Sequence, residues 1–474
     1  MKKILLVGAE AVPFASTGGL GDVMGSLPEA LASKGADVRA VMPLYSNIAH
    51  AYRDKMEKVC EFTVHLSWRR QYCGVYAYKK GSATYYFIDN EYYFHRNSIY
   101  GQYDDGERFA FFCHAVLDMM PLIGFFPDVL HANDWHAALT VIYLKQKYGV
   151  DRRFGDIKTV YTIHNIDYQG IFDFAILGDV FDLSGEARPT VEFDGCVNLS
   201  KGAIVCCDRL TTVSHSYAGE LQSPYFSGRL SAIISQQAYK TRGIVNGIDT
   251  AYYNPATDFE IKMPYSAHDL AGKRENKREL QRLLGLSESP TTPIVAMISR
   301  LASHKGFDLV RCVLEEMLAW NIQFVLLGTG DTELEAYFSD LAKRYPGKVG
   351  VSLAFDKTLA KGIYAGADIF LMPSKSEPCG LSQMIASRYG TVPVVRAIGG
   401  LSDTIHPYDP ETREGNGITF LSYNAHDMMD AVHRAVSLYG QDEHWSALLQ
   451  NAMAVDFSWE RSAAGYLSIY DELT

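Results

Sequence analysis

Residues 3–42, KILLVGAEAVPFASTGGLGDVMGSLPEALASKGADVRAVM, decide the fold class of this chain. Residues 4–8 form a continuous apolar run, which is typical of a parallel strand buried on both faces. After the glycine-rich loop STGGLGD we expect a helix over 23–34, which Gly35 ends, and a second strand over 38–42. Strand, helix and strand in this order predict a βαβ unit with a right-handed crossover.

The same alternation continues through the first half of the chain. Predicted strands at 128–131, 159–163 and 210–213 end at the polar sequences HAND, HNIDYQG and SHSY. A helix is expected over 135–147, directly after HAND.

The pattern starts again after the sequence VNGID. Five predicted strands, each followed by a polar loop, cover 294–298, 323–327, 349–354, 368–372 and 391–396. The predicted helices of this half cover 307–320, 333–344 and 381–388, and a last one covers 459–473.

We therefore expect an α/β protein of two Rossmann-like, doubly wound domains that face each other across a deep cleft. The first domain is expected over 1–245 and the second over 246–456, and the C-terminal helix, about 457–474, can pack back on the first. In open parallel sheets, ligands bind beyond the carboxyl ends of the strands. Functional residues are therefore expected in the strand-end loops.

The composition is that of a globular enzyme. Of the 474 residues, 47% are apolar and 21% are charged, and 44 basic against 55 acidic side chains give a net charge of −11. Nucleic acids and anionic membranes attract positive surfaces, so neither is expected as a partner. We see no stretch that is long and apolar enough to span a bilayer.

The cysteines indicate a reducing compartment. All eight lack C-x-x-C pairing and metal-ligand spacing, and several lie in apolar runs. Glu10 interrupts the apolar N-terminal run, which therefore fits a buried strand better than a signal peptide. We expect a cytoplasmic protein, or a plastid protein only if a transit peptide has been removed.

Three strand-end loops of the first half carry candidate residues. TGGLGD opens a helix, where glycine amides and the helix N-terminus favour an anion such as phosphate. It matches neither G-x-G-x-x-G nor a Walker loop, so a purely structural turn is the alternative. HANDWH has metal-like spacing but no second ligand cluster, so Asp134 is the better candidate, as a hydroxyl acceptor or base. His164 follows the next strand, and the alternative there is a structural histidine.

Cationic residues follow the first strand of the second half. SRLASHKG places Arg300 and Lys305 in one loop, where a diphosphate is the natural partner and two solvated surface cations are the alternative. GTGD, after the next strand, is a glycine-rich turn at a helix start and contains Gly328 and Gly330. Together the two loops favour phosphate binding.

A carboxylate follows the fourth predicted strand of this half. SEPCGLSQ places Glu377 just before a helix, where it can accept hydrogen bonds from two sugar hydroxyls. The backbone amides of Cys379, Gly380 and Leu381 are expected to point at the same bound group. No histidine accompanies Cys379 in sequence, so we interpret its thiol as a packing group and not as a nucleophile.

These motifs together resemble those of the bacterial glycogen synthase and plant starch synthase family. The similarity runs in order from Lys3 to about Leu473. It rests on the strings KILLVGAEAVPFASTGGLGDVMGSLPEAL, HANDWHAAL, TIHNIDYQG, VNGID, SRLASHKGFDL, GTGD, PSKSEPCGLSQ and YGTVPVVRAIGGLSDT. Each string alone is unspecific, whereas the set is specific.

The resemblance implies the glycosyltransferase-B fold and transfer of glucose from ADP-glucose to the non-reducing end of an α-1,4-glucan, glycogen or starch. It implies retention of the anomeric configuration, and neither a cofactor nor a metal. It assigns Arg300 and Lys305 to the donor diphosphate and Glu377 to the transferred glucose. The other implied site residues are Asp134 and His164, which face the sugar, Asn246 of the same cleft, and Phe355, which stacks on the nucleobase.

One position departs from the family pattern, which reads K-T-G-G-L at the first glycine-rich loop. Ser16 replaces the lysine and precedes Thr17, Gly18 and Gly19, all of which the resemblance assigns to the donor site. A serine keeps a hydrogen bond to phosphate but loses the charge. An arginine of the sequence WRR is a candidate to fold over the site and supply that charge.

Other activities compete with this interpretation. UDP-glucose is an alternative donor. Another glycosyltransferase or a sugar-nucleotide epimerase shares the fold, but the sequences around Asp134, His164 and Glu377 favour a glucan synthase. A glucan phosphorylase needs a lysine for pyridoxal phosphate, and no such motif stands out. Ser16 suggests a non-catalytic or weakly active glucan-binding homologue, although such a protein has no physical need of the charged groups that remain.

Overall fold

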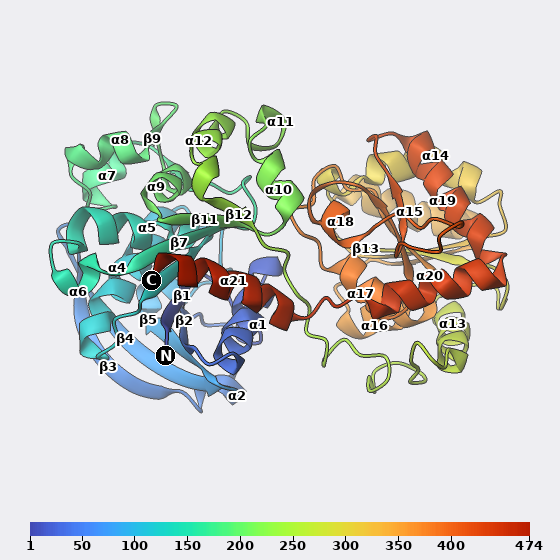
Figure 1. Cartoon of the computed structure of the whole chain (residues 1–474), viewed down its shortest axis with the longest axis horizontal. Coiled ribbons are helices and arrows are strands. Elements are labelled where there is room, and N and C mark those ends of the chain that lie inside the picture. The colour runs from blue at the N-terminus through green and yellow to red at the C-terminus, as the bar shows by residue number, and fades with distance from the viewer. The chain divides into compact units, whose positions relative to one another are not determined.

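The computed structural model describes residues 1–474 and divides into two compact units. The first unit comprises Met1–Gly247 together with Trp459–Thr474, and the second comprises Ile248–Ser458. In Figure 1 the first unit runs from blue to green, and the dark red C-terminal helix α21 belongs to it. None of the helices has the length and apolar character needed to cross a membrane.

A nine-stranded sheet forms the centre of the first unit, in the order β12-β11-β7-β6-β1-β2-β5-β4-β3. Its neighbouring strands are parallel except in the β3–β4 and β4–β5 pairs. Along the chain these strands are β1 (Lys3–Val7), β2 (Asp37–Pro43), β3 (Glu57–Leu66), β4 (Arg69–Lys80), β5 (Ala83–Asp89), β6 (Val129–Asn133), β7 (Lys158–Ile163), β11 (Arg209–Thr212) and β12 (Thr241–Gly243).

Helices and a second, small sheet complete the first unit. The small sheet has the order β8 (Ile171–Phe172), β10 (Cys196–Asn198) and β9 (Glu192–Phe193). The helices are α1 (Gly19–Ser33), α2 (His50–Arg53), α3 (Glu91–Phe94), α4 (Asp105–Leu122), α5 (Asp134–Tyr143), α6 (Arg152–Gly155), α7 (Ile176–Asp179), α8 (Arg188–Val191), α9 (Leu199–Cys206), α10 (His215–Glu220), α11 (Pro224–Ser227), α12 (Leu230–Gln236) and α21 (Trp459–Leu473).

The strand order of the first unit reverses at one point. From β1 the chain builds outward to β2 and β5, and it then returns to place β6 on the other side of β1. Loops at such a switch point diverge to opposite faces of the sheet and leave a crevice at the carboxyl ends of the strands. The loops that follow β1 and β6 therefore begin at the place where this fold binds ligands.

The second unit has a six-stranded parallel sheet in the order β15-β14-β13-β16-β17-β18, with its switch point between β13 and β16. Its strands are β13 (Ile294–Ile298), β14 (Gln323–Leu327), β15 (Val349–Ser352), β16 (Ile369–Met372), β17 (Val392–Arg396) and β18 (Ile418–Phe420). Its helices are α13 (Ala271–Leu283), α14 (Phe307–Met317), α15 (Thr332–Arg344), α16 (Lys357–Gly366), α17 (Ser382–Arg388), α18 (Gly399–Thr404), α19 (Ala425–Tyr439) and α20 (Asp442–Ala454).

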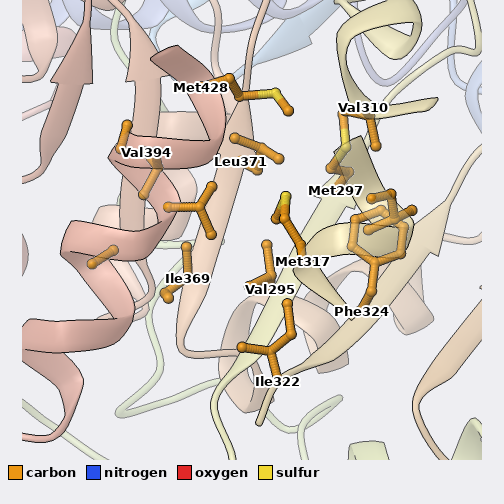
Figure 2. Packing of buried hydrophobic residues seen from close by; sticks show 14 of the residues in the cluster. Val295, Met297, Val310, Met317, Ile322, Phe324, Ile369, Leu371, Val394 and Met428 are labelled. Carbon is orange, nitrogen blue, oxygen red and sulfur yellow. The ribbon is translucent and has the colours of Figure 1, made fainter. Parts of the chain in front are cut away.

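Apolar side chains fix the central strands of the second unit. Figure 2 shows Val295 and Met297 of β13 among Ile369 and Leu371 of β16 and Met317 of α14. Each of these five side chains is at most 2% exposed. Burial of a side chain of this size stabilises the fold by about 1.5–3 kcal/mol. The core therefore holds the ends of β13 and β16, and with them the loops that follow, in defined positions.

The C-terminal helix α21 packs on α1 in the first unit. His131 of β6 links this helix to the sheet, because its Nδ1 lies 2.7 Å from the Tyr470 hydroxyl and its Nε2 lies 2.5 Å from Thr162 Oγ1. All three side chains are fully buried. The imidazole thus ties the end of the chain to the two central strands β6 and β7.

The predicted fold class is confirmed, since both units are α/β structures with the Rossmann strand order. The predicted and observed helices and strands differ where the residues have only a weak intrinsic preference for helix or strand. The helix expected from residue 23 begins at Gly19, because Gly19 and Gly21 adopt helical conformation although glycine disfavours it. The antiparallel strands β3 and β4 were not predicted, because β3 is mostly exposed and lacks a buried apolar run.

Candidate active site

Loops that follow β13 and β16 lie against each other at the switch point of the second unit. Gly306, with φ of +80°, permits this approach, because a Cβ there would lie 2.1 Å from the carbonyl oxygen of Pro373. The amide of Lys375 donates a hydrogen bond of 2.8 Å to the carbonyl of His304. The two loops are therefore fixed side by side.

The turn GTGD packs just as closely on the loop after β13. A Cβ on Gly328 would lie 1.8 Å from the carbonyl oxygen of Ser299, and a Cβ on Gly330 would lie 2.3 Å from that of Leu301. The Leu301 amide donates to the carbonyl between the two glycines over 2.9 Å. The close approach of the two loops accounts for both glycines and places the turn beside Arg300.

Lys305 and Glu377, from the two adjacent loops, form an ion pair. Lys305 Nζ lies 2.7 Å from Glu377 Oε2, and the Ser374 hydroxyl donates to the same carboxylate oxygen over 3.0 Å. The two side chains are 19% and 9% exposed. They were predicted to contact different parts of a donor, and in the structure they also contact each other.

Arg300 and Phe355 are predicted residues of the second unit with exposed side chains. Arg300 follows β13, and its guanidinium forms no ion pair within the chain, so its five N–H donors remain available to an anion. Phe355, in the loop between β15 and α16, is 87% exposed.

The glycine-rich turn after β17 supports the loop that carries Glu377. The Gly400 amide donates to the Glu377 carbonyl over 3.1 Å, and a Cβ on Gly400 would lie 2.2 Å from the carbonyl oxygen of Cys379. The Cys379 side chain is 5% exposed. No hydrogen bond within the chain occupies the amides of Gly380, with φ of +73°, and Leu381.

The glycine-rich loop of the first unit connects β1 to α1. The Thr17 amide donates to Glu10 Oε2, and Thr17 Oγ1 lies 3.4 Å from Glu10 Oε1. Gly18 and Gly19 are exposed, and a Cβ on either would meet no atom within 4 Å. The first amides of α1 lack partners within the helix, so this end of α1 is open to an anion.

Ser16 is folded against the first turn of α1. Its Oγ donates to the Gly18 carbonyl over 3.2 Å and lies 2.1 Å from the position of a Cβ on Gly21. The charge that serine lacks does not come from Arg69, the first arginine of WRR. Arg69 pairs instead with carboxylates of α4 and α7, at 3.1 Å and 3.0 Å, so that expectation is wrong for this residue.

Asp134 and His164 lie together at the ends of β6 and β7. Asp134 begins α5 with a left-handed φ of +57°, a conformation that costs a non-glycine residue about 1–3 kcal/mol and clusters at functional sites. Its Oδ1 accepts a hydrogen bond from the His164 amide over 2.8 Å. Nε2 of His164 lies 2.9 Å from Asn133 Oδ1.

Desolvation sets the protonation states of this group. It raises the pKa of Asp134 to about 7, and the charge of Glu10 adds to the rise. Burial also raises the pKa of Glu10. It lowers the pKa of His164 to about 3, so this imidazole is neutral at pH 7. Since Asn133 Oδ1 only accepts, Nε2 of His164 carries the proton and Nδ1 is an acceptor.

The two histidines of HANDWH have structural contacts. Both ring nitrogens of His131 are occupied by the hydrogen bonds described above. His136 packs between aromatic rings, with centroids 4.1 Å from Trp135 and 4.4 Å from Tyr100. Burial lowers the pKa of each imidazole to about 3.

Asn246, from VNGID, is the last residue but one of the segment Met1–Gly247 of the first unit. It is 5% exposed, and its Oδ1 has no hydrogen-bond partner. A buried acceptor left unpaired costs about 1–3 kcal/mol, which a ligand hydroxyl would recover.

A hollow of about 330 Å³ adjoins the loop that follows His164. Polar side chains of Asp167, Gln169 and Asn198 line it together with the rings of Phe193 and Phe226. Polar groups next to aromatic faces suit a ligand that has both hydroxyls and an apolar face.

Three residues of the site are not predicted from the sequence: Glu10, Asn133 and Ser374. Each bonds to a predicted residue, namely Thr17, His164 or Glu377. Their position at or just after the carboxyl end of a strand was the available signal.

The two units offer different chemistry at their switch points. The second presents an exposed guanidinium, an ammonium–carboxylate pair and open amides, which suit the charge that develops on a departing diphosphate. The first presents an open helix end, a protonatable carboxyl and a neutral imidazole, which suit phosphate and sugar hydroxyls. Two Rossmann-like units with these groups define a glycosyltransferase that uses a nucleotide-sugar donor.

Comparisons with known proteins agree with this class. Residues 3–236 match the family model described as starch synthase catalytic domain, and residues 285–451 match that of glycosyl transferases group 1. The chain is 48% identical to the glycogen synthase of Geobacillus thermodenitrificans over 99% of its length and 98% of the relative's. It is also 48% identical to a Bacillus cereus glycogen synthase, over 99% of both chains.

Solved structures show the same relationship. The catalytic domain of starch synthase IV from Arabidopsis thaliana, bound to ADP and acarbose, superposes with a TM-score of 0.92 at 33% identity, over 100% of this chain and 99% of the other. Sucrose-phosphate synthase from Thermosynechococcus elongatus shares the fold, with a TM-score of 0.63 at 17% identity. The chain belongs to the glycogen synthase and starch synthase family and is a glucosyltransferase of the glycosyltransferase-B fold.

Proposed function

We propose that this enzyme transfers glucose from ADP-glucose to the non-reducing end of an α-1,4-glucan, with retention of the anomeric configuration. The observation that carries the proposal is the Lys305–Glu377 pair, 2.7 Å long, in the loops at the switch point of a Rossmann-like unit. The bound ADP and acarbose of Arabidopsis starch synthase IV support an adenine nucleotide as donor and an α-glucan as acceptor.

The second unit is proposed to bind the donor. Arg300 and Lys305 contact its diphosphate, and they stabilise the negative charge that grows as the bond to glucose breaks. Arg300 is suited to bidentate contact with phosphate oxygens, whereas Lys305 acts as a point charge. The GTGD turn, with Gly328 and Gly330, packs on the loop of Arg300 and supports it, and the amides of both glycines donate to acceptors within the chain. Phe355, exposed at its loop, stacks on the adenine.

Glu377 is proposed to orient the transferred glucose. Its Oε2 already bonds to Lys305 and Ser374, so Oε1 remains to accept from a sugar hydroxyl. The open amides of Gly380 and Leu381, with Cys379 before them, add donors for the same group. Orientation of a reactant can supply several kcal/mol of a barrier.

The first unit is proposed to contact the sugar and the diphosphate. Asp134 accepts from glucose hydroxyls, and neutral His164 offers its Nδ1 as a further acceptor. Asn246, whose Oδ1 is unpaired, takes another hydroxyl. The exposed loop from Ser16 through Thr17, Gly18 and Gly19 contributes backbone amides to the diphosphate.

The acceptor is proposed to enter along the hollow beside the loop after His164. Its polar side chains and two phenylalanine rings match the hydroxyls and the apolar faces of glucose units. We also propose a cytoplasmic location, because all eight cysteines are free thiols.

An incorporation assay tests the proposal. The enzyme is incubated with glycogen and radiolabelled ADP-glucose or UDP-glucose, and label in precipitated glucan is measured. We expect incorporation from ADP-glucose with a much higher kcat/KM than from UDP-glucose. Comparable kcat/KM for the two donors would refute the donor assignment. No incorporation from either donor would favour a non-catalytic glucan-binding protein.

A further inference from the structure

An exposed tryptophan stands at the tip of the β3–β4 hairpin, a part of the chain with no role in the proposed reaction. Ser67, with φ of +55°, makes the turn, and the following residue, Trp68, is 73% exposed. A single exposed apolar side chain is ordinary on a protein surface. The environment of this ring, however, is not that of a freely moving surface residue.

Hydrogen bonds and stacking hold the Trp68 ring in one orientation. Its Nε1 donates to Asp179 Oδ1 over 2.6 Å. The guanidinium carbon of Arg69 lies 4.5 Å from the centroid of the indole ring. Arg69 is itself held by Asp179 Oδ2 at 3.0 Å and by Glu107 Oε2 at 3.1 Å. The guanidinium covers one face of the indole, and the exposed fraction leaves the other face to solvent.

The ring lies at the same edge of the sheet as the candidate residues of the first unit. β4 is antiparallel to β5, and Gly74 of β4 pairs with Asp89, the last residue of β5. Residues 69–73 of β4 therefore continue beyond the carboxyl end of β5, by about 16 Å at the usual rise of a strand. Because β5, β2, β1 and β6 are successive parallel neighbours, Asp134 leaves the sheet at this carboxyl edge too.

We propose that Trp68 is a binding platform for a glucan chain whose end reacts elsewhere on this edge of the first unit. The inference rests on the proposed function, since it needs a polymeric α-1,4-glucan as acceptor. The open face of the indole packs on the C–H groups of a glucose unit, and the half-exposed carboxylate of Asp179 accepts from its hydroxyls. Because the ring is already immobile, binding costs little side-chain entropy.

A platform away from the reacting end contacts only acceptors that are long enough to reach it. Trp68→Ala is therefore expected to raise the KM for glycogen about fivefold to tenfold, as for loss of a tryptophan anchor, with kcat unchanged. The kcat/KM for maltotriose should stay at the wild-type value. Trp68→Phe keeps an aromatic ring but loses the bond to Asp179, so an intermediate KM for glycogen is expected.

Tyr239→Ala is the matched control, because Tyr239 is also 73% exposed and lies in a short 3₁₀ turn, Ala238–Lys240, near the opposite end of the sheet. It should leave both acceptors unaffected. Retardation of each variant in native gels that contain glycogen provides a binding measurement that does not depend on turnover. Only Trp68→Ala, and partly Trp68→Phe, should migrate faster than the wild type.

An unchanged KM and unchanged retardation in Trp68→Ala would overturn the proposal. An equal loss with maltotriose and glycogen would also overturn it, because Trp68 would then act at the reacting end. A change in oligomeric state, measured by size-exclusion chromatography, with normal glycogen retardation would overturn it too and assign the ring to contact with a second copy. Failure of the wild type to transfer glucose from any donor would contradict the proposed function, while the gel retardation still tests Trp68 alone.

Discussion

Lys305 Nζ lies 2.7 Å from Glu377 Oε2, so the cation proposed for the diphosphate and the carboxylate proposed for the glucose are direct partners. The ammonium group has three N–H donors, which allow it to reach a phosphate oxygen without leaving Glu377. Each residue therefore positions the other, and substitution of either one should affect both functions.

Glu377→Ala should nearly abolish transfer while the fold is retained. The substitution removes the group proposed to orient the glucose and also frees Lys305 and the Ser374 hydroxyl. Steady-state kinetics with ADP-glucose and circular dichroism provide the two readouts. Glu333→Ala, which breaks a surface ion pair with Arg311, is the control and should keep full activity. A kcat for Glu377→Ala within tenfold of the wild type would contradict the assignment.

Arg300→Ala and Lys305→Ala should each lower kcat/KM for the donor by roughly 10²-fold, as for loss of one preorganised electrostatic group. They should differ in stability. Lys305→Ala leaves the largely buried Glu377 without its cation and should lower the melting temperature, whereas Arg300 has no ion pair to lose. Arg311→Ala is a surface control for both. Wild-type kcat and KM in either variant would show that its cation does not bind the diphosphate.

Sequence patterns predicted β13, β14 and α21 with the bounds seen in the structure. The two strands are short, mainly apolar runs between polar loops, and α21 has apolar residues at helical spacing, so local and tertiary preferences agree. The hairpin of β3 and β4 lacks such a signal, because long-range pairing and not residue type decides where a half-exposed strand lies.

Which loops carry functional groups follows from the strand order, but their contacts do not follow from sequence. Glu377 and Lys305 are 72 residues apart, and the pairing of β13 with β16 and the packing of Gly306 on Pro373 bring their loops together. Glu10 appeared in the sequence as an interruption of an apolar run, whereas the structure shows it as the acceptor of the Thr17 amide. Side-chain partners depend on distances that spacing along the chain does not determine.

Ser16→Lys should raise kcat/KM for the sugar nucleotide about tenfold, equal to about 1.4 kcal/mol, because it adds a charge-assisted contact at the open end of α1. Ser16 is exposed, so a longer side chain has room. Ser16→Ala should change kcat/KM by less than about twofold, since Ser16 Oγ bonds only to the Gly18 carbonyl. A fall in kcat/KM for Ser16→Lys would mean that another cation already occupies this place.

Asp134 should make the stability of the enzyme depend on pH. Its pKa is about 7 in the folded chain and 3.8 ordinarily, so the folded state holds a proton that the unfolded state has lost between these values. Stability from this group therefore falls as pH rises through that window. Asp134→Asn has no carboxyl group to titrate at this position. Its free energy of unfolding, measured with urea, should therefore fall less than that of the wild type between pH 3.8 and about 7. Parallel losses in both proteins would contradict the shifted pKa.

The ionisation of Asp134 should also appear in the pH dependence of the reaction rate. As a hydroxyl acceptor Asp134 acts in its ionised form, so kcat/KM should rise with pH around a midpoint of about 7. His164 does not titrate there, because burial lowers its pKa to about 3. The residual kcat/KM of Asp134→Asn should not show this rise with pH. If kcat/KM of this variant still rises with pH around 7, the rise comes from another group, and the assignment to Asp134 is wrong.

Tyr470→Phe tests how α21 is held on the first unit. The substitution leaves His131 Nδ1 buried without its partner, which should cost about 1–3 kcal/mol. Urea unfolding followed by fluorescence measures the loss. Tyr345→Phe, which removes a hydroxyl bonded to Glu315 at the surface, is the control and should be nearly neutral. Equal stability of the wild type and Tyr470→Phe would show that the bond to His131 does not hold the helix.

The reaction itself is tested most directly by proton NMR of a mixture of enzyme, ADP-glucose and maltotriose. We predict one ADP for each glucose added, with the new anomeric signal that of an α-1,4 linkage at the non-reducing end of maltotetraose. Glu377→Ala in the same mixture should give no product within the time of the wild-type reaction. A β-linked product, or release of free glucose without chain extension, would contradict the assignment of a retaining glucan synthase.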